Sequence, residues 1–543
     1  MAHNLLNSQK KFLCPWPKKI PTFILILIHL LTLSPLFAAS PAKQSKTSSF
    51  GTTLRLGWYS KPAPLDPFKV SDTISVSVMY LIFNRLVRYD QKGDFQPELA
   101  ERWQISNDGL AYTFFLKKNV RFHNGQLFTA KDVAYTFKLS SDPAINPAYY
   151  TDFALIRSWE VLNDFTIRIT LKEPYSPFLL ILWRVRIIPD SILDSTTLED
   201  FIKRPIGTGP FIFESQNSDG EMKLKANKDY FEGSPHVNGM QIKIFPSKTQ
   251  VWSAFLRGDI DMIFYLNHND YKEIKDNPSF QIFRTLSAAG YALMFNVKDP
   301  MLASKKVRTA IAYAINRQEL IENLEAGEGI LTDSLFHPHS WAYLSGKVQA
   351  FDPEKTKAIL REEGFVEKGQ SWVKDGKELA LNLLLDPKNE NFVRMAKMLR
   401  QQLQEAGIKI YFKFFADYKD LQEKVYQKNS EFQAYLFTFN TGPEPDTVRA
   451  YAQTSAPYNW GSYSNEKVDS LFELASKKYK LEERAEAYKQ VQLIMEDERP
   501  TIFFYIPYVF HATSNKISNA ENLFGPFIPF YALKDIYKKE ERG

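Results

Sequence analysis

Apolar and polar residues alternate in many short segments of the chain, and runs with helical spacing separate these segments. Alternation with a period of two predicts half-buried strands, and the runs between them predict helices. The strand candidates are rich in Phe, Tyr, Ile and Val; they are Thr52–Trp58, Ala111–Leu116, Phe165–Leu171, Met240–Phe245, Leu379–Leu385, Ile408–Phe415 and Thr501–Phe510. Strands and helices that alternate along the whole chain indicate an α/β or mixed fold.

Several predicted helices carry recognisable start signals. Thr129 and Asp132 are three positions apart and form a capping box, in which each side chain accepts a hydrogen bond from backbone at the other end of the first turn. Asp352 precedes Pro353, a pairing typical of an N-cap followed by the first helical position. Asn316 directly follows an amphipathic run and is placed to start a new helix. Such starts between strand candidates support the α/β interpretation.

Residues 1–39 have the pattern of a secretory signal peptide. They contain four lysines and no acidic residue, include the apolar run Thr22–Leu33, and end in small residues. A basic start, a short apolar core and a small-residue exit are typical of such signals. An N-terminal membrane anchor is the alternative. It is disfavoured because the run is shorter than the roughly 20 residues of a membrane span, and Pro35 follows the run.

The order of these features predicts export without a lipid anchor. Cys14 precedes the apolar core, so it does not match the lipidated cysteine of a bacterial lipoprotein, and the signal has no lipobox. Residues 40–50 are polar and predict a flexible leader. We therefore expect a periplasmic protein with a cleaved signal peptide. Without residues 1–39 the chain has no cysteine, which suits an oxidising compartment.

Length, charge and cysteine content narrow the function further. A single core stops growing at roughly 250–300 residues, so a chain of 543 residues predicts at least two lobes. The formal charge of +6 falls to +2 once the four lysines of residues 1–39 are removed, and the basic residues are scattered. Nucleic-acid binding, which needs a concentrated basic face, is therefore not expected. One cysteine also excludes a disulfide framework and a Cys-rich zinc site.

Sequence motifs of catalysis and metal binding are missing. The sequence contains no Gly-x-Ser-x-Gly elbow, His-Glu-x-x-His helix, dinucleotide fingerprint or Walker-type phosphate loop. His337 and His339 form a close histidine pair. One interpretation is two metal ligands; the other is a solvated loop, since Pro338 interrupts any helix and no carboxylate is adjacent. We expect no catalytic residue, no metal and no cofactor.

Longer phrases of the sequence resemble a known family. The phrases in the first half are Val87–Asp90, Gln96–Trp103, Ser106–Phe114, Val120–Val133, Pro205–Phe211 and Ala226–Phe231. Those in the second half are Val307–Arg317, Phe351–Lys355, Asn459–Asn465 and Arg484–Gln492. In this order they resemble family 5 of the bacterial extracellular solute-binding proteins, which holds the oligopeptide-, dipeptide- and nickel-binding components of ABC importers. The resemblance covers nearly all of residues 52–510.

The resemblance implies an α/β fold of the two-lobed, periplasmic-binding-protein-like type II, a flytrap with an extra subdomain in the first lobe. Lobe one would comprise residues 50–288 and 503–543, and lobe two would comprise residues 289–502. The chain would cross between the lobes at Gly290–Asn296 and Thr501–Tyr505. Two crossings agree with the lack of a Pro/Gly/Ser-rich linker in the sequence, because interwoven lobes need none.

The resemblance also implies where a ligand binds. In peptide-binding relatives an extended ligand pairs with protein backbone as an added strand, and wet pockets accept its side chains. Residues at or beside the matching positions are predicted to contact the ligand; they are Trp58, Tyr59, Tyr149, Tyr150, Asn459, Trp460, Tyr505 and Tyr508. For each of them, packing in a core or at the hinge is the alternative.

One departure from the family pattern puts specificity for free peptides in doubt. Peptide-binding relatives hold the α-ammonium of the ligand with an aspartate a few residues before an acidic-Pro pair. Here that position falls on Thr441, beside Asn440, and neither residue is charged. Either Glu444 or Asp446 takes over the role, or the ligand lacks a free amine there, because a buried ammonium without a partner is costly. Asp446 is otherwise expected to cap a helix that starts one residue later.

These observations predict an exported, monomeric substrate-binding receptor of an ABC importer. It would capture a peptide or a similar small extended solute between two lobes and deliver it to a permease in the inner membrane. The alternatives are a secreted peptide-processing hydrolase and a ligand-sensing receptor without a permease. The missing nucleophile and metal motifs disfavour the hydrolase.

Overall fold

The structure is a computed structural model that describes residues 52–539 apart from 70–71, 91–92, 191, 347, 427–431 and 526–529. The chain divides into a unit of residues Met1–Ser49 and a unit of residues Phe50–Gly543, and every element described below belongs to the second unit. The predicted signal peptide (1–39) and leader (40–50) lie outside the described residues. Within the described part of the chain, no helix is both long and apolar enough to cross a membrane.

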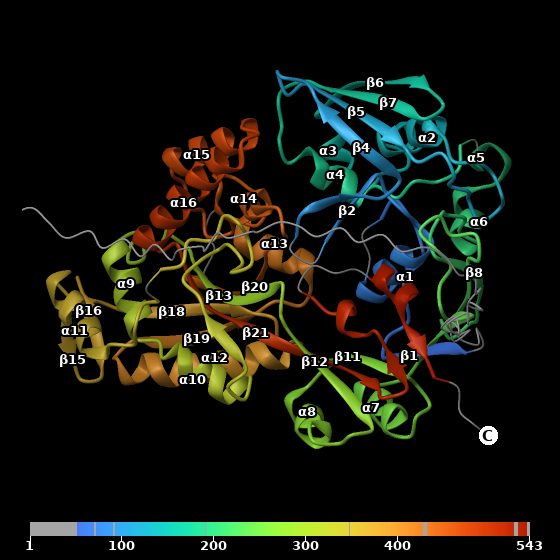
Figure 1. The fold of residues 1–543 in the computed structure, drawn as a ribbon. Coiled ribbons are helices and arrows are strands. Elements are labelled where there is room, and N and C mark those ends of the chain that lie inside the picture. The colour runs from blue at the N-terminus through green and yellow to red at the C-terminus, as the bar shows by residue number, and fades with distance from the viewer. Residues whose placement is uncertain are drawn as a thin grey trace, which may run out of the picture. The chain divides into compact units, whose positions relative to one another are not determined.

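A twelve-stranded sheet runs through this unit (Figure 1). Its main path has the strand order β19-β18-β20-β13-β21-β11-β1-β10-β9-β8, and β12 and β14 also pair with β21. The strands are β1 (Thr53–Trp58), β8 (Phe211–Gln216), β9 (Met222–Ala226), β10 (Gly239–Ile244), β11 (Met262–Leu266), β12 (Phe280–Leu286), β13 (Ala289–Phe295), β14 (Gly329–Leu331), β18 (Ala380–Leu385), β19 (Lys409–Phe414), β20 (Ala434–Asn440) and β21 (Thr501–Ser514).

The predicted strands are confirmed, including the two that lie outside this sheet, β5 (Ala111–Leu116) and β7 (Thr166–Leu171). Their ends agree with the predicted ends within one residue, except that β21 continues past Phe510 to Ser514. Successive residues of β13 alternate between two buried clusters, with Leu293 in one and Ala292 in the other. Strands of this kind are covered on both faces, which is why their sequences are almost uniformly apolar.

The sheet has two halves, β19-β18-β20-β13 with β14 and β11-β1-β10-β9-β8 with β12, and strand β21 lies between them. Its residues Thr501–Pro507 pair with β13 and β14, whereas Tyr508–Ser514 pair with β11 and β12. The change of partners falls at Pro507, which lacks the N–H that a continuous ladder would use. The predicted crossing segments Gly290–Asn296 and Thr501–Tyr505 run side by side, since β13 and β21 are antiparallel neighbours.

Helices pack on the strands of this sheet, and local capping sets where several of them begin. Asn316 accepts a hydrogen bond from the Glu319 N–H, and Asp352 from the Lys355 N–H, which confirms both predicted starts. The helices are α1 (Thr73–Ile82), α7 (Lys248–Leu256), α8 (His268–Ile274), α9 (Lys305–Tyr313), α10 (Arg317–Leu324), α11 (Pro353–Glu362), α12 (Glu390–Glu405), α13 (Tyr418–Tyr426), α14 (Arg449–Ala452), α15 (Glu466–Lys477) and α16 (Leu481–Glu498).

A separate four-stranded sheet, ordered β4-β5-β7-β6, has its own core and forms the extra subdomain. It includes β4 (Ala100–Ile105), β6 (Ile156–Asn163), α2 (Ala130–Ser140), α3 (Tyr150–Phe153) and α4 (Phe178–Arg184). The two short helices that follow, α5 (Ile192–Ser195) and α6 (Leu198–Lys203), pack against the core of the large sheet. The predicted capping box at the start of α2 is confirmed, with the Thr129 N–H donating to Asp132 Oδ2 at 2.6 Å.

The remaining elements are short. They are β2 (Val87–Tyr89), β3 (Phe95–Pro97), β15 (Val366–Lys368), β16 (Ser371–Lys374), β17 (Lys377–Glu378), β22 (Ile517–Ser518), β23 (Tyr537–Lys538) and the 3-10 helices η1 (Pro445–Val448), η2 (Glu521–Leu523) and η3 (Phe530–Asp535).

Candidate ligand-binding site

The carboxyl ends of parallel strands mark the place where a ligand is expected. β10 and β11 run parallel to β1, and β19 and β20 run parallel to β18. These strands end at Trp58, Ile244 and Leu266 in one half of the sheet and at Leu385, Phe414 and Asn440 in the other. Ligands of open α/β sheets bind just beyond such ends. Each half of the sheet therefore offers one side of a binding site.

A cleft of about 880 Å³ lies beyond these ends, and we call it the junction cleft. Residues of β1, β11, α8 and β21 line it together with residues of α10 and α12. Its aromatic side chains are Trp58, Tyr59, Phe264, Tyr265, Tyr291 and Tyr508. Its ionisable side chains, tyrosines aside, are Lys248, His268, Asp270, Lys272, Glu322, Glu325 and Arg394. Aromatic walls with a few polar groups are typical of sites for small organic ligands.

Two smaller hollows continue from the junction cleft, one after the other. The far-wall pocket, of about 460 Å³, is lined by the aromatic residues Tyr435, Phe437 and Trp460 and by the charged residues Asp386 and Lys388, among others. A third hollow, of about 300 Å³, shares Tyr265 with the junction cleft and Asn440 with the far-wall pocket. Because they share lining residues, the three hollows follow one another and can hold an extended molecule.

Five of the predicted ligand-contact residues line these hollows. Trp58, Tyr59 and Tyr508 line the junction cleft, and Asn440 and Trp460 line the far-wall pocket. The rings of Trp58 and Tyr59 are stacked with their centroids 5.9 Å apart. These residues remain predicted ligand contacts, and the structure brings them to the same groove.

Four other predicted residues do not line the three hollows. Tyr149 is buried in the core of the four-stranded subdomain, whereas Tyr150 is exposed at the start of α3. The Asn459 side-chain amide donates to the Tyr463 carbonyl oxygen at 2.7 Å and holds its own loop. Tyr505 is buried beneath the junction cleft, where its hydroxyl makes a hydrogen bond described below. For Tyr149 and Asn459, this conformation therefore favours the alternative given in the sequence analysis, that they are packing residues, over ligand contact.

Thr441, at the position where peptide-binding relatives have an aspartate, is also a packing residue. Only 2% of its surface is exposed. Its hydroxyl donates to the Ala288 carbonyl oxygen at 3.2 Å, and its backbone N–H donates to the same oxygen at 3.0 Å. A carboxylate here would face a carbonyl oxygen, so this position supports the strands instead of presenting a charge.

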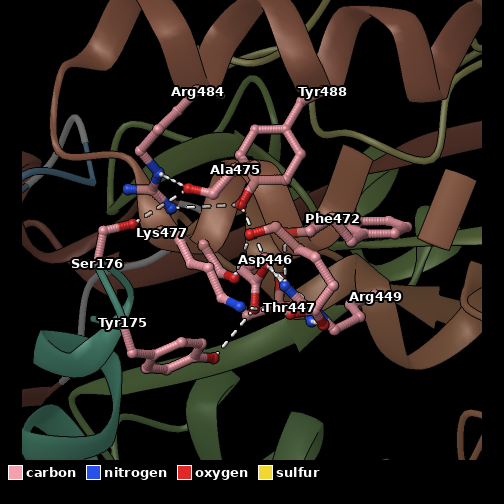
Figure 2. A network of polar contacts seen from close by, with 12 residues as sticks. Tyr175, Ser176, Asp446, Thr447, Arg449, Phe472, Ala475, Lys477, Arg484 and Tyr488 are labelled. Atoms are coloured by element: carbon pink, nitrogen blue, oxygen red, sulfur yellow. Dashed lines mark hydrogen bonds and ion pairs between the residues drawn. The ribbon is translucent and has the colours of Figure 1, made fainter. Parts of the chain in front are cut away.

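Glu444 and Asp446 are both paired with arginines of the protein; Figure 2 shows the arginine partner of Asp446. Arg484 forms a buried ion pair with Glu444. Asp446 accepts hydrogen bonds from the Arg449 guanidinium at 3.0 Å and from the Tyr488 hydroxyl at 3.1 Å. Burial raises the pKa of Glu444. Both carboxylates are thus engaged within the protein, which disfavours the alternative that one of them holds a ligand ammonium.

The predicted helix cap at Asp446 is wrong. The cap of η1 is Glu444, whose Oε1 accepts a hydrogen bond from the Asp446 N–H at 3.1 Å. Pro445 occupies the first helical position, where a proline is favoured because its missing N–H has no partner there anyway. The helix therefore starts at Pro445, and the Asp446 side chain is left for the arginine and tyrosine contacts.

Two distant stretches of the chain meet at Asp446 (Figure 2). The Tyr175 hydroxyl donates to Asp446 Oδ2 at 3.0 Å. The neighbouring Ser176 donates twice, from its N–H to the Ser476 carbonyl oxygen at 2.6 Å and from its hydroxyl to the Ala475 carbonyl oxygen at 3.2 Å. The segment before α4 is in this way joined to η1 and to the end of α15.

A second set of contacts continues this junction. The Tyr479 hydroxyl donates to the Gly109 carbonyl oxygen at 2.9 Å and lies 3.2 Å from the Tyr112 hydroxyl, and Lys477 pairs with Glu173 at 3.4 Å. Gly109 has φ +72°, and a Cβ there would lie 2.4 Å from the Tyr479 ring, so only glycine fits. We call the contacts of Tyr175, Ser176, Lys477 and Tyr479 with their partners the latch.

Backbone contacts join the two halves of the large sheet at a different place. We call this place the hinge, and it consists of Leu286–Ala288 and Pro507–Tyr508. The Ser287 N–H donates to the Pro507 carbonyl oxygen at 2.9 Å. The Ser287 carbonyl oxygen lies 3.0 Å from His337 Nε2, and His337 Nδ1 accepts from the His339 N–H at 3.2 Å. Such contacts require the neutral ring with its proton on Nε2. Burial lowers the pKa of His337 to about 4.

These contacts decide between the two interpretations of the histidine pair. His337 is fully buried, so the interpretation as a solvated loop is wrong for this residue. Both of its ring nitrogens face backbone groups, which disfavours the alternative of a metal ligand. Across the described residues, no group of three His, Cys, Asp or Glu side chains is placed to hold a metal ion.

Sequence reasoning missed the residues that α8, α10 and α12 bring to the junction cleft. Among them is Glu325, whose Oε1 accepts a hydrogen bond from the Tyr505 hydroxyl at 3.0 Å. Burial raises the pKa of Glu325. In the sequence Glu325 is one of several acidic residues at the end of an amphipathic helix, and nothing in that pattern distinguishes it from a solvated one.

Comparisons with known proteins agree on one family. Residues 94–461 match the family described as Bacterial extracellular solute-binding proteins, family 5 Middle. The oligopeptide-binding protein AppA of Bacillus subtilis is 25% identical over 547 residues, covering 96% of this chain and 99% of that protein. The heme-binding protein A of Haemophilus influenzae is 29% identical over 454 residues, covering 78% of this chain and 81% of that protein.

A solved structure gives the same result. The structure of NikZ from Campylobacter jejuni in complex with Ni(L-His) has a TM-score of 0.74 and is 26% identical in sequence. It covers 90% of this chain and 99% of that chain. The similarity therefore extends over nearly the whole length of both proteins.

The fold and the groove between the two halves of the sheet define a two-lobed type II solute-binding protein. The chain belongs to family 5 of the bacterial extracellular solute-binding proteins. The family prediction made from the sequence phrases is confirmed. Members of this family are binding proteins and not enzymes, and a substrate-binding receptor of an ABC importer is the role that follows.

Proposed function

We propose that this receptor captures a peptide or a similar extended solute between its lobes and delivers it to a permease in the inner membrane. The observation that carries the proposal is the row of three hollows at the carboxyl ends of strands from both halves of the sheet. A row of linked hollows suits an elongated ligand with several side chains better than a compact one. The relative named as an oligopeptide-binding protein supports the same ligand class.

The lobe boundaries are part of this proposal. Lobe one comprises residues 50–288 and 503–543, and lobe two comprises residues 289–502. The change of β21 partners at Pro507 supports boundaries close to these, with the return to lobe one a few residues later. We further propose that the protein is a periplasmic monomer after cleavage of residues 1–39, as the signal pattern indicates.

The far-wall pocket supports a ligand with side chains of varied type. The Trp460 ring packs edge-on against Tyr435 with centroids 5.0 Å apart, and Tyr458 is its other aromatic neighbour at 5.9 Å. Asp386 and Lys388 add one charge of each sign to the lining. Such a pocket accepts apolar and polar groups alike, so main-chain contacts would supply the affinity.

The identity of the solute is tested by mass spectrometry on compounds that co-purify with the gently isolated protein. Recovery of mixed short peptides is the expected result. The ligand-free protein is then heated with pools of short peptides, and binding at a hundredfold excess over Kd should stabilise it by about 2.7 kcal/mol. A single sugar or chelate, without any response to peptides, would overturn the peptide proposal and leave the receptor class intact.

A matched pair of variants locates the site. Tyr458→Ala changes an exposed residue of the far-wall pocket, and Tyr411→Ala changes another exposed residue, on β19, that lines none of the three hollows. We expect weaker peptide binding for Tyr458→Ala and unchanged binding for Tyr411→Ala. Equal binding by both would place the ligand elsewhere. Cleavage of the bound peptide would favour the hydrolase alternative instead.

A further inference from the structure

Glu325 is a buried acid at the end of a helix that reaches the junction cleft. Only 7% of its surface is exposed. It is the C-cap residue of α10, with its N–H bonded to the Ile321 carbonyl oxygen. The negative end of the helix dipole makes this an unfavourable place for a carboxylate. A residue whose burial and position both oppose its charge needs a compensating contact.

The protein supplies that compensation only in part. Tyr505 donates one hydrogen bond to Oε1 at 3.0 Å. Among the described residues, the nearest basic nitrogen to the carboxylate is His268 Nδ1, 4.0 Å from Oε2, and no lysine or arginine nitrogen is within ion-pair distance. Burial lowers the pKa of His268, which keeps that ring neutral at pH 7. His268 Nε2 is itself buried without a hydrogen-bond partner. The charge of Arg394, which also lines the cleft, acts to lower the pKa of Glu325, against the effect of burial. Arg394 is exposed, however, and its guanidinium donates to the Asn323 carbonyl oxygen and forms no ion pair with Glu325 among the described contacts.

Tyrosines lie beside Glu325 and elsewhere along the same cleft. The rings of Tyr291 and Tyr505 have their centroids 5.2 Å apart, and Tyr291 lines the cleft. Tyr265 lines it too, with φ +59° and 54% of its surface exposed. A tyrosine in the left-handed region is strained, and such strain persists where the position serves a function. Ring faces attract cations, so these tyrosines favour a positively charged group.

We propose that Glu325, held by Tyr505, is the anchor for a cationic group of the ligand, an ammonium or a guanidinium, in the junction cleft. The inference rests on the proposed function, because it assumes that the solute occupies this cleft. It also answers the question raised by Thr441. The acid that pairs with a ligand amine is not near the acidic-Pro pair, where Glu444 and Asp446 are engaged by arginines. It stands instead on α10.

The anchor is tested with pairs of peptides that differ in one charge. The probes are a pool of short peptides and the same pool acetylated at the N-terminus, together with lysine- and norleucine-containing twins. Isothermal titration calorimetry on the ligand-free full-length protein should show at least tenfold tighter binding of the cationic member of one pair. The amine pair and the lysine pair tell which group of the ligand is held.

Variants then assign this preference to Glu325. Glu325→Gln keeps an acceptor for Tyr505 and should weaken binding of the cationic probe at least tenfold, with less than threefold change for the neutral twin. Tyr505→Phe removes the positioning hydroxyl and should weaken the cationic probe less, about threefold. Glu362→Gln, the same change at the exposed end of α11, is the matched control and should bind as wild type. The thermal midpoint of each variant shows that it is folded.

Two results would overturn the inference in distinguishable ways. Peptide binding that is equal for both members of every pair, or equal in wild type and Glu325→Gln, would remove the anchor and leave the peptide receptor standing. Failure of the wild type to bind any probe would remove the anchor together with the proposed peptide function.

Discussion

The two lobes are joined in two chemically different ways, at the hinge and at the latch. The hinge is made of backbone: β21 pairs with strands of both lobes, and the Ser287 N–H bonds to Pro507. The latch is made mostly of side chains, such as the hydroxyls of Tyr175 and Tyr479. Backbone pairing survives most substitutions, whereas each latch contact depends on one side chain. A receptor that must open and close needs a permanent junction and a breakable one, and the two sets of contacts fit these roles.

Loss of the buried Arg484–Glu444 ion pair, which lies next to the latch, should have the largest effect on the free energy of unfolding. Arg484→Ala removes the partner of the buried Glu444 and leaves an uncompensated carboxylate, which should lower the free energy of unfolding by about 3–5 kcal/mol. Denaturant unfolding measures the change. Lys489→Ala, on the same helix α16, removes an exposed ion pair with Glu486 and should cost about 0–1 kcal/mol. Equal losses in the two variants would show that the buried pair contributes no more to stability than the exposed one.

Acid should lower the stability of the protein by protonating His337, which contacts the hinge at Ser287. The pKa of His337 is about 4 in the folded protein, against about 6.5 in an unfolded chain. The unfolded state therefore binds an additional proton between these values, and stability falls as the pH drops from 6.5 toward 4. For this residue alone, the loss between pH 8 and pH 5 is roughly 2 kcal/mol.

His337→Gln isolates that contribution from other buried histidines. Burial also lowers the pKa of His123 to about 4 and of His511 to about 3, so the whole protein should lose stability on acidification for the same reason. Unfolding measured at pH 8 and pH 5 should show a smaller loss for the variant, by roughly 2 kcal/mol. Parallel losses in variant and wild type would mean that His337 does not titrate as its surroundings indicate.

The smallest effect should come from a single latch contact. Tyr175→Phe removes one hydrogen bond to Asp446 and should destabilise the closed arrangement by about 0.5–1.5 kcal/mol, since that is the net value of one such bond. The population of ligand-free protein should shift toward open forms, which small-angle X-ray scattering detects as a larger radius of gyration. Tyr411→Phe, exposed on β19, is the control. An unchanged scattering curve for Tyr175→Phe would show that the latch contact contributes nothing to closure.

The sequence predicts the local features of this protein well. Alternating runs such as Ala111–Leu116 and caps such as Asp352 depend on residues a few positions apart, and the structure contains them. The cap at Asp446 failed for a local reason, because Pro445 moved the helix start forward. Motif phrases also gave the correct family, since many of them occur in the family's order.

The site was predictable only where the motif phrases reach it. Trp58 and Asn440 lie at strand ends that the family pattern marks, and they line the groove. Glu325 lines the junction cleft because the tertiary fold places the end of α10 there. The sequence of a single amphipathic helix does not show which of its ends will be buried by a distant segment. The latch was missed for the same reason: Tyr175 and Asp446 are 271 positions apart.

The shared strand β21 also sets the order in which the molecule can be completed. A chain synthesised only as far as Pro500 contains β11, β12, β13 and β14 but lacks the strand that pairs with all four. Until Thr501–Ser514 is made, those strands present unpaired edges, which invite wrong pairing. Neither lobe can therefore finish folding early in translation. The two lobes reach their native pairing together, once Thr501–Ser514 is made.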